Sequence, residues 1–184
     1  MNLPIESALV TLIPEAEVLV ERFRNQYDPA AAIGVPAHVT VLYPFKSPRE
    51  LTTDVIQSLE ELFFKFPAFG ASFTETGRFP GVLYLSPEPV EIFRQLTKIV
   101  TRGFPETPPY GGQFTDVVPH LTVTQVSDSQ RLEKIAADFE HAAKDHLPIQ
   151  SSVREIALMD NESGRWKVRN RFALSPNTSQ RTRG

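Results

Sequence analysis

The four residues His38-Val39-Thr40-Val41 recur 82 positions later as His120-Leu121-Thr122-Val123. Valine, leucine and threonine favour strands, and polar and apolar residues alternate in both segments. Because successive side chains of a strand point to opposite faces, each histidine shares a face with the threonine two positions further on. The apolar face must pack on a core. We therefore expect each segment to present one imidazole and one hydroxyl on the face that points away from that core.

The repeat is longer than the motif. The apolar runs 7–13 and 81–86 are each followed by a Pro-Glu pair, which is typical of the first turn of a helix. After each motif strand, residues that cap helices appear again. The pattern predicts helices over 14–27, 47–66, 87–102 and 127–145, and further strands over 69–79, 149–159 and 167–174. Each half of the chain thus reads strand, helix, motif strand, helix.

This order of elements predicts an α+β fold class with a bilobal architecture. We expect two pseudo-symmetric lobes of antiparallel-rich sheet, with helices on the outer faces and the His/Thr faces meeting in a central cleft. Residues 1–175 are expected to form this single domain, since 184 residues can bury a sizeable core. Residues 176–184 are expected to be a disordered polar tail.

The composition limits the catalytic chemistry, the ligands and the cellular location that we expect for this chain. The chain has no cysteine, which excludes disulfides, thiolate nucleophiles and cysteine-ligated zinc. Its net charge of −3 fits a small phosphorylated ligand or an RNA end better than a long duplex nucleic acid. It has neither a signal-peptide pattern nor an apolar run of membrane-spanning length. We expect a cytoplasmic monomer with no membrane partner.

Two histidines facing one substrate can divide the work of cleaving a phosphodiester. One neutral imidazole takes a proton from the attacking hydroxyl, and one charged imidazole gives a proton to the leaving oxygen. The hydroxyls of Thr40 and Thr122 can hydrogen-bond the non-bridging phosphate oxygens. This scheme for His38 and His120 needs neither a cofactor nor a metal.

The doubled H-x-T-x motif, with its matching flanks, resembles the two-histidine (2H) phosphoesterase superfamily, which includes the 2′-5′ RNA ligase-like proteins and the RNA 2′,3′-cyclic phosphodiesterases. The resemblance extends from about Ser7 to Leu174. It implies a bilobal fold with both motifs in the cleft. It also implies metal-independent hydrolysis or ligation of 2′-linked or 2′,3′-cyclic phosphodiesters of RNA ends or small nucleotides, with His38 and His120 as the acid/base pair.

Other residues are weaker candidates for substrate contacts. Tyr110 and Phe114 lie in the glycine-rich stretch before His120, and Tyr43 follows the first motif, so these three could stack on a base. Arg78 could contact a phosphate. A basic stripe at 165, 167, 169 and 171 predicts either an RNA-facing edge or a charged edge that prevents aggregation.

Three alternatives remain open from the sequence. Each motif histidine, taken singly, could be a half-exposed strand residue without a catalytic role. The whole cleft could bind an RNA end or a cyclic nucleotide without turnover. The two histidines could instead be metal ligands of a hydrolase. Sequence alone does not assign which histidine is the acid and which the base.

Overall fold

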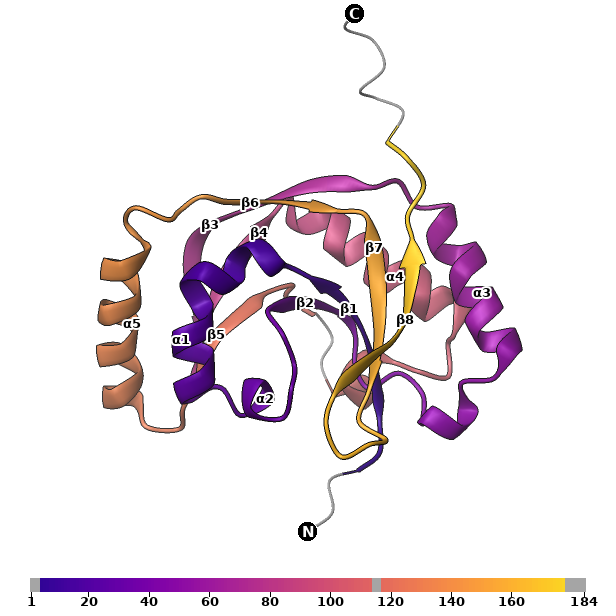
Figure 1. Ribbon diagram of the computed structural model, residues 1–184, viewed down its shortest axis with the longest axis horizontal. Coiled ribbons are helices and arrows are strands. Elements are labelled where there is room, and N and C mark those ends of the chain that lie inside the picture. Colours follow the sequence, from indigo (N-terminus) through magenta and orange to yellow (C-terminus); the bar gives the residue numbers. More distant parts are fainter. Residues whose placement is uncertain (1–3, 114–116, 178–184) are drawn as a thin grey trace, which may run out of the picture.

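The computed structural model describes residues 4–113 and 117–177. The chain alternates short strands and helices (Figure 1), in the order β1 (Ser7–Leu12), η1 (Pro14–Ala16), α1 (Glu17–Tyr27), α2 (Pro29–Ala32), β2 (His38–Leu42), η2 (Pro48–Glu50), α3 (Thr53–Phe64), β3 (Phe69–Phe79), β4 (Val82–Glu88), α4 (Val90–Gly103), η3 (Pro109–Gly112), β5 (Leu121–Gln125), α5 (Ser129–Ala143), β6 (Ile149–Val153), β7 (Glu155–Asp160) and β8 (Lys167–Ala173).

The strands form two four-stranded sheets, with the orders β2-β1-β7-β8 and β5-β4-β3-β6. Every pairing within them is antiparallel. The two motif strands β2 and β5 are edge strands of their respective sheets, and they lie in contact with each other. The predicted α+β class with two lobes is confirmed, and the two edges that carry the motifs meet in the middle of the molecule.

Helices α1 and α4 each pack on the motif strand from the other half of the chain. Helix α1 follows β1 but packs on β5, and α4 follows β4 but packs on β2. Helices α3 and α5 complete the cover by packing on β8 and β4, so that α1 and α5 lie at one end of the molecule and α3 and α4 at the other (Figure 1). The buried apolar residues of both lobes consequently form one continuous core.

The region 149–159, expected to be one strand, is two strands in different sheets. β6 pairs with β3, whereas β7 pairs with β1, and Arg154 separates them. Figure 1 shows β6 running across the top of the molecule and β7 turning down from it. The prediction of a single strand was wrong because apolar content marks both pieces as strands but does not mark the change of sheet. The predicted hairpin of β7 and β8 is confirmed.

The strand β7 is buried on both of its faces. Ile156 and Leu158 belong to the main core, whereas Ala157 and Met159 belong to a second apolar cluster with Ala8 and Val10 of β1. This second cluster covers the face of the first sheet that points away from the helices. A surface of small and medium apolar side chains is therefore present beside β2, next to the first motif.

Candidate active site

Both motifs line the same cleft. The side chains of His38, Thr40, His120 and Thr122 all line a hollow of about 370 Å³. All four are half-buried. Alternation along each strand explains this position. The apolar residues between and after the polar ones are buried in the main core, and the polar residues therefore lie on the opposite face. The buried residues are Val39, Val41, Leu121 and Val123. Two equivalent sets of one imidazole and one hydroxyl thus face a common space.

Each motif strand carries a β-bulge directly after its threonine. Val10 pairs with Thr40 but Leu9 pairs with Leu42, so Val41 is an extra residue. A bulge moves all later side chains to the other face. This explains why Tyr43 lines the cleft although the simple alternation from His38 places it on the opposite face. The carbonyl oxygen of Val41 accepts a hydrogen bond of 2.8 Å from the Thr97 hydroxyl of α4.

The second motif strand repeats this feature. Tyr84 pairs with Thr122 but Leu83 pairs with Thr124, so Val123 is the extra residue in β5. The bulge turns Gln125 into the cleft, as the first bulge turns Tyr43. Gln125 is a cleft residue that the sequence reasoning missed. The 82-residue offset from Tyr43 is the signal that could have found it.

The two imidazoles are oriented in the same way. Nδ1 of His38 lies 2.8 Å from the carbonyl oxygen of Pro36, and Nδ1 of His120 lies 2.7 Å from the carbonyl oxygen of Val118. A carbonyl can only accept a hydrogen bond, so each Nδ1 carries a proton and donates. In the neutral ring, Nε2 is then the unprotonated nitrogen. Each histidine is thereby fixed in the tautomer that suits proton exchange at Nε2.

Burial favours the neutral form of both histidines. Loss of hydration lowers the pKa of His38 from 6.5 to about 4, an effect that its hydrogen bond to Pro36 opposes. The pKa of about 4 also includes two smaller effects, the charge of Arg24, which lowers it, and the charge of Asp28, which raises it. Burial also lowers the pKa of His120. A negative charge placed between the rings would favour the charged form of each imidazole.

A buried ion pair supports the first motif. Nη2 of Arg24 lies 2.9 Å from Oδ2 of Asp28, and both side chains are almost fully buried. Arg24 also donates to the carbonyl oxygen of Val35, and Asp28 accepts from the backbone N–H of Ala30 to cap α2. Asp28 itself lines the cleft. The pair therefore holds the segment that leads into His38.

The second motif rests on aromatic rings instead. The ring of His120 lies 5.1 Å from that of Phe79 and 5.4 Å from that of Tyr84, and these two rings stack on each other at 4.4 Å. The ring of Tyr84 lies across Gly77, where a Cβ atom would come within 2.3 Å of it. Gly77 therefore leaves the space in which Tyr84 can support His120.

Aromatic side chains form one wall of the cleft. Tyr43 makes edge contacts with Tyr110 at 6.3 Å and with Trp166 at 6.1 Å, and all three line the cleft. The hydroxyl of Tyr110 contacts the side chain of Thr40. Tyr110 has a backbone φ of 51°, a conformation that is costly for a residue with a side chain and that recurs at functional sites.

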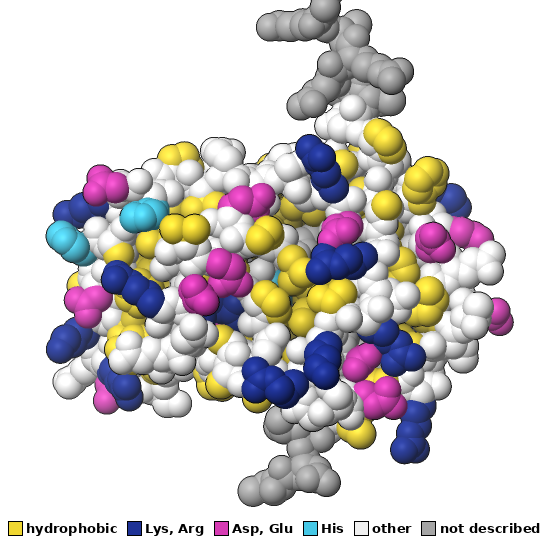
Figure 2. Space-filling model, in the orientation of Figure 1, with side chains coloured by type: hydrophobic (Ala, Val, Ile, Leu, Met, Phe, Trp, Pro, Cys, Tyr) yellow, Lys and Arg dark blue, Asp and Glu magenta, His cyan; other side chains and the backbone are white. Residues whose placement is uncertain are grey.

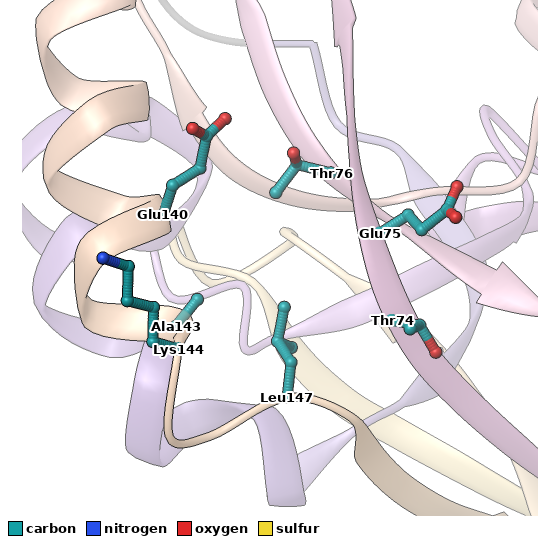
Figure 3. A pocket seen from close by; sticks show the side chains of 7 residues that line it. All are labelled: Thr74, Glu75, Thr76, Glu140, Ala143, Lys144 and Leu147. Carbon is teal, nitrogen blue, oxygen red and sulfur yellow. The ribbon is translucent and has the colours of Figure 1, made fainter.

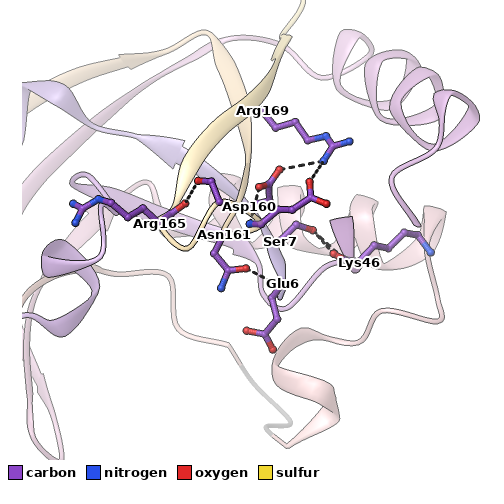
Figure 4. A network of polar contacts seen from close by, with 9 residues as sticks. Glu6, Ser7, Lys46, Asp160, Asn161, Arg165 and Arg169 are labelled. Carbon is purple, nitrogen blue, oxygen red and sulfur yellow. Dashed lines mark hydrogen bonds and ion pairs between the residues drawn. The ribbon is translucent and has the colours of Figure 1, made fainter. Parts of the chain in front are cut away.

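A polar network anchors this aromatic wall. The hydroxyl of Tyr43 donates a 2.6 Å hydrogen bond to Glu6, and burial together with this contact raises the pKa of Tyr43 to about 12. The backbone N–H of Glu6 donates in turn to Asn161 of the turn between β7 and β8 (Figure 4). The backbone N–H of Trp166 donates to the carbonyl oxygen of Ile33. The turn is thereby tied both to β1 and to the loop before His38.

The other predicted contact residues lie elsewhere. Arg78 is outside the cleft and forms ion pairs with Glu133 and Glu140. It lies near a separate hollow of about 440 Å³ between β3 and α5, which Glu140 also lines (Figure 3). No motif residue lines that hollow. Phe114 lies outside the described residues.

The basic stripe is engaged in local contacts. Arg169 pairs with Asp160 and Glu162, Arg171 pairs with Glu155, and Arg165 donates to the carbonyl oxygen of Ala32. Arg169 and Arg171 lie on β8, an edge strand, whereas Arg165 lies in the turn before it. On the face shown in Figure 2, basic and acidic side chains are interspersed. These contacts are those of a charged sheet edge.

Two kinds of feature are absent from the described part of the chain. Residues 4–113 and 117–177 contain no group of three or more His, Asp or Glu side chains arranged to hold a metal ion. Within the same ranges, none of the helices has the length and apolar character needed to cross a membrane.

Comparison with known proteins places the chain in a family. The model described as the 2′-5′ RNA ligase superfamily matches residues 13–165. The chain belongs to the 2′-5′ RNA ligase superfamily. The resemblance to the 2H phosphoesterases that the motifs indicated is thereby confirmed.

Two curated relatives match most of the chain. A Bacillus licheniformis protein, provisionally named a phosphoesterase, is 25% identical over 170 residues, which cover 90% of this chain and 96% of the relative. A similarly named protein of Bacillus cereus is 29% identical over 157 residues, covering 82% of this chain and 86% of the relative. The protein is accordingly an enzyme of the 2H phosphoesterase kind.

Solved structures share the fold. A protein from Thermus thermophilus superposes with a TM-score of 0.62 at 20% identity, covering 94% of this chain and 99% of the other. LigT from E. coli, solved in complex with 3′-AMP, superposes with a TM-score of 0.58 at 16% identity, again covering 94% of this chain and 99% of the other. The bilobal arrangement is therefore the common fold of these proteins.

Proposed function

We propose that this protein is a metal-independent phosphoesterase that hydrolyses, or reversibly ligates, 2′-linked or 2′,3′-cyclic phosphodiesters of RNA ends or small nucleotides. One observation carries the proposal: two equivalent pairs of histidine and threonine, 82 residues apart in the sequence, line one cleft. Structures of E. coli LigT in complex with 3′-AMP, NADP⁺ and ATP support a small nucleotide as the ligand class. We further propose that the protein acts as a cytoplasmic monomer.

The proposed reaction is a proton relay across a phosphate. For a cyclic substrate, the Nε2 atom of one histidine takes a proton from water as the water oxygen bonds to phosphorus. The phosphorus–oxygen bond to the ribose breaks, and Nε2 of the other histidine gives its proton to that oxygen. Thr40 and Thr122 donate to the non-bridging oxygens and position the phosphorus between His38 and His120. The atoms and charges balance without a further reactant.

Each histidine must be able to hold the charge that its role requires. Burial favours two neutral rings before substrate binds. The phosphodiester anion raises the pKa of the nearby imidazoles, so that one of them binds a proton as substrate enters. The base is then already neutral, and the acid gains its proton at the moment of binding.

The aromatic wall supports a nucleobase next to this phosphate. We propose that Tyr43 and Tyr110 stack on the base, because both line the cleft and aromatic faces bind bases with little sequence preference. Phe114 stays a prediction for the same role. Arg78 is engaged by two glutamates outside the cleft and is not part of this proposal.

The test is turnover of a nucleoside 2′,3′-cyclic phosphate in the presence of EDTA. We expect His38→Ala and His120→Ala each to lower kcat by about 10²- to 10⁴-fold, which is the usual contribution of a general acid or base. His141→Ala on α5 is the matched control, because His141 lies outside the cleft, and its activity should match that of the wild type.

Three results would contradict the proposal. Near-full rates in both His38→Ala and His120→Ala would remove their catalytic role. Loss of activity in EDTA that a divalent ion restores would favour a metal hydrolase. Saturable nucleotide binding without product after long incubation would favour a binding module.

A further inference from the structure

The pseudo-symmetry of the cleft extends to a third pair of residues. Tyr43 and Gln125 are separated by the same 82 residues as the motif histidines. Each follows a bulge directly after the motif threonine, and each lines the cleft. A bulge present at the same place in both halves is a built feature rather than a local irregularity. Both halves therefore direct the fifth residue after the histidine into the cleft.

The third pair differs from the first two in its chemistry. The histidines and threonines are the same in both halves, as a shared phosphate would require. Tyr43 and Gln125 are different residue types, so the cleft offers a different surface on each side of the bound phosphate. On the β2 side, Tyr43 joins Tyr110, Trp166 and Met159 in an apolar and aromatic wall. The β5 side offers an amide instead.

The Gln125 amide is available to a ligand. The side chain is exposed at the cleft, and it makes no hydrogen bond to any residue in the part of the chain that the structure describes. The hydroxyl of Tyr43, in contrast, is already bound to Glu6. An amide offers both donors and an acceptor, which suits a ribose hydroxyl or the polar edge of a base.

We propose that Gln125 determines substrate specificity by hydrogen-bonding the second nucleoside of a linear 2′-linked diester, on the β5 side of the phosphate. The proposal rests on the proposed function. In a 2′,3′-cyclic mononucleotide both ester oxygens belong to one ribose, so its single nucleoside occupies the aromatic side. A linear diester carries a nucleoside on each ester oxygen. Its second nucleoside extends away from Tyr43, toward Gln125.

The experiment compares two substrates: a 2′-5′-linked diadenosine monophosphate and adenosine 2′,3′-cyclic phosphate. Gln125→Met keeps the length of the side chain but removes the amide. We expect it to lower kcat/KM for the linear diester about tenfold, the loss of one hydrogen bond to substrate. The cyclic substrate should change less than about twofold, because it makes no contact that this variant removes. Gln130→Met, on the exposed surface of α5, should leave both values unchanged.

Several results would overturn the role of Gln125. These are an unchanged kcat/KM for the linear diester, an equal loss on both substrates, and a wild-type enzyme that turns over only the cyclic substrate. All three leave the proposed phosphoesterase function intact. Failure of the wild type on both substrates would instead refute the proposed function, and this inference with it. Equal melting temperatures of the wild type and both variants show that each result concerns binding and not folding.

Discussion

Replacing Arg24 by methionine should destabilise the protein far more than the loss of one surface charge. The side chains of Arg24 and Asp28 are 3% and 2% exposed, and the guanidinium makes two contacts with the carboxylate, at 2.9 and 3.0 Å. The substitution leaves Asp28 as an unpaired buried charge. It also leaves the carbonyl oxygen of Val35 without its hydrogen bond from Arg24.

Breaking a buried ion pair by removing one partner typically costs about 3–5 kcal/mol. With a urea m-value of about 2 kcal/mol per molar, the unfolding midpoint should fall by about 1.5–2.5 M. Trp166 is the single tryptophan and lies in the cleft, so its fluorescence reports unfolding. Urea titrations of the wild type and Arg24→Met therefore measure the effect directly.

Two further variants separate the loss of a buried ion pair from the loss of a charge alone. Arg102→Met removes an exposed charge from the last turn of α4 and should cost less than about 1 kcal/mol. Arg24→Met combined with Asp28→Asn removes the unpaired charge and should recover part of the lost stability. A loss below about 1 kcal/mol in Arg24→Met, or a double variant less stable than the single one, would refute the assignment of a buried supporting pair.

Two other predictions follow from the surroundings of the histidines. Because the fold keeps His38 and His120 neutral, the unfolded chain takes up protons first, so stability should fall as the pH drops from about 6.5 to about 4. Urea midpoints across this range should fall less steeply in His38→Gln, and identical slopes would contradict the lowered pKa. Gly77→Ala should lower both the melting temperature and kcat, since its Cβ atom would displace the Tyr84 ring. Gly70→Ala on the same strand meets nothing within 4 Å and is the control; equal effects of the two would contradict the account.

Local patterns were sufficient to predict the motif strands and their shared face. Alternation of polar and apolar residues places His38 with Thr40 and His120 with Thr122, and the structure has this arrangement. The repeat of strand, helix, motif strand and helix predicted two lobes. These features depend on the periodicity of neighbouring residues, which the sequence displays directly.

The remaining features depend on contacts between distant segments. The bulges at Val41 and Val123 appear only in the pairing with β1 and β4, so the placement of Tyr43 and Gln125 in the cleft could not be read from alternation. The change of sheet at Arg154 likewise has no local signal.

The burial of the Arg24–Asp28 pair could not be predicted from local sequence either. Its spacing of four residues is common on exposed helices, where such pairs contribute little. Here both side chains are buried, and Arg24 also binds the loop before His38 through the carbonyl oxygen of Val35. Sequence reasoning therefore found the residues proposed to perform the chemistry but missed those that support them.

A crystal structure with bound orthovanadate or phosphate tests the central claim most directly. The account predicts one anion in the cleft, with Nε2 of His38 and of His120 and the hydroxyls of Thr40 and Thr122 all within hydrogen-bond distance of its oxygens. An anion held by only one of the two motifs, or bound elsewhere while the cleft takes up none at saturating concentration, would contradict it.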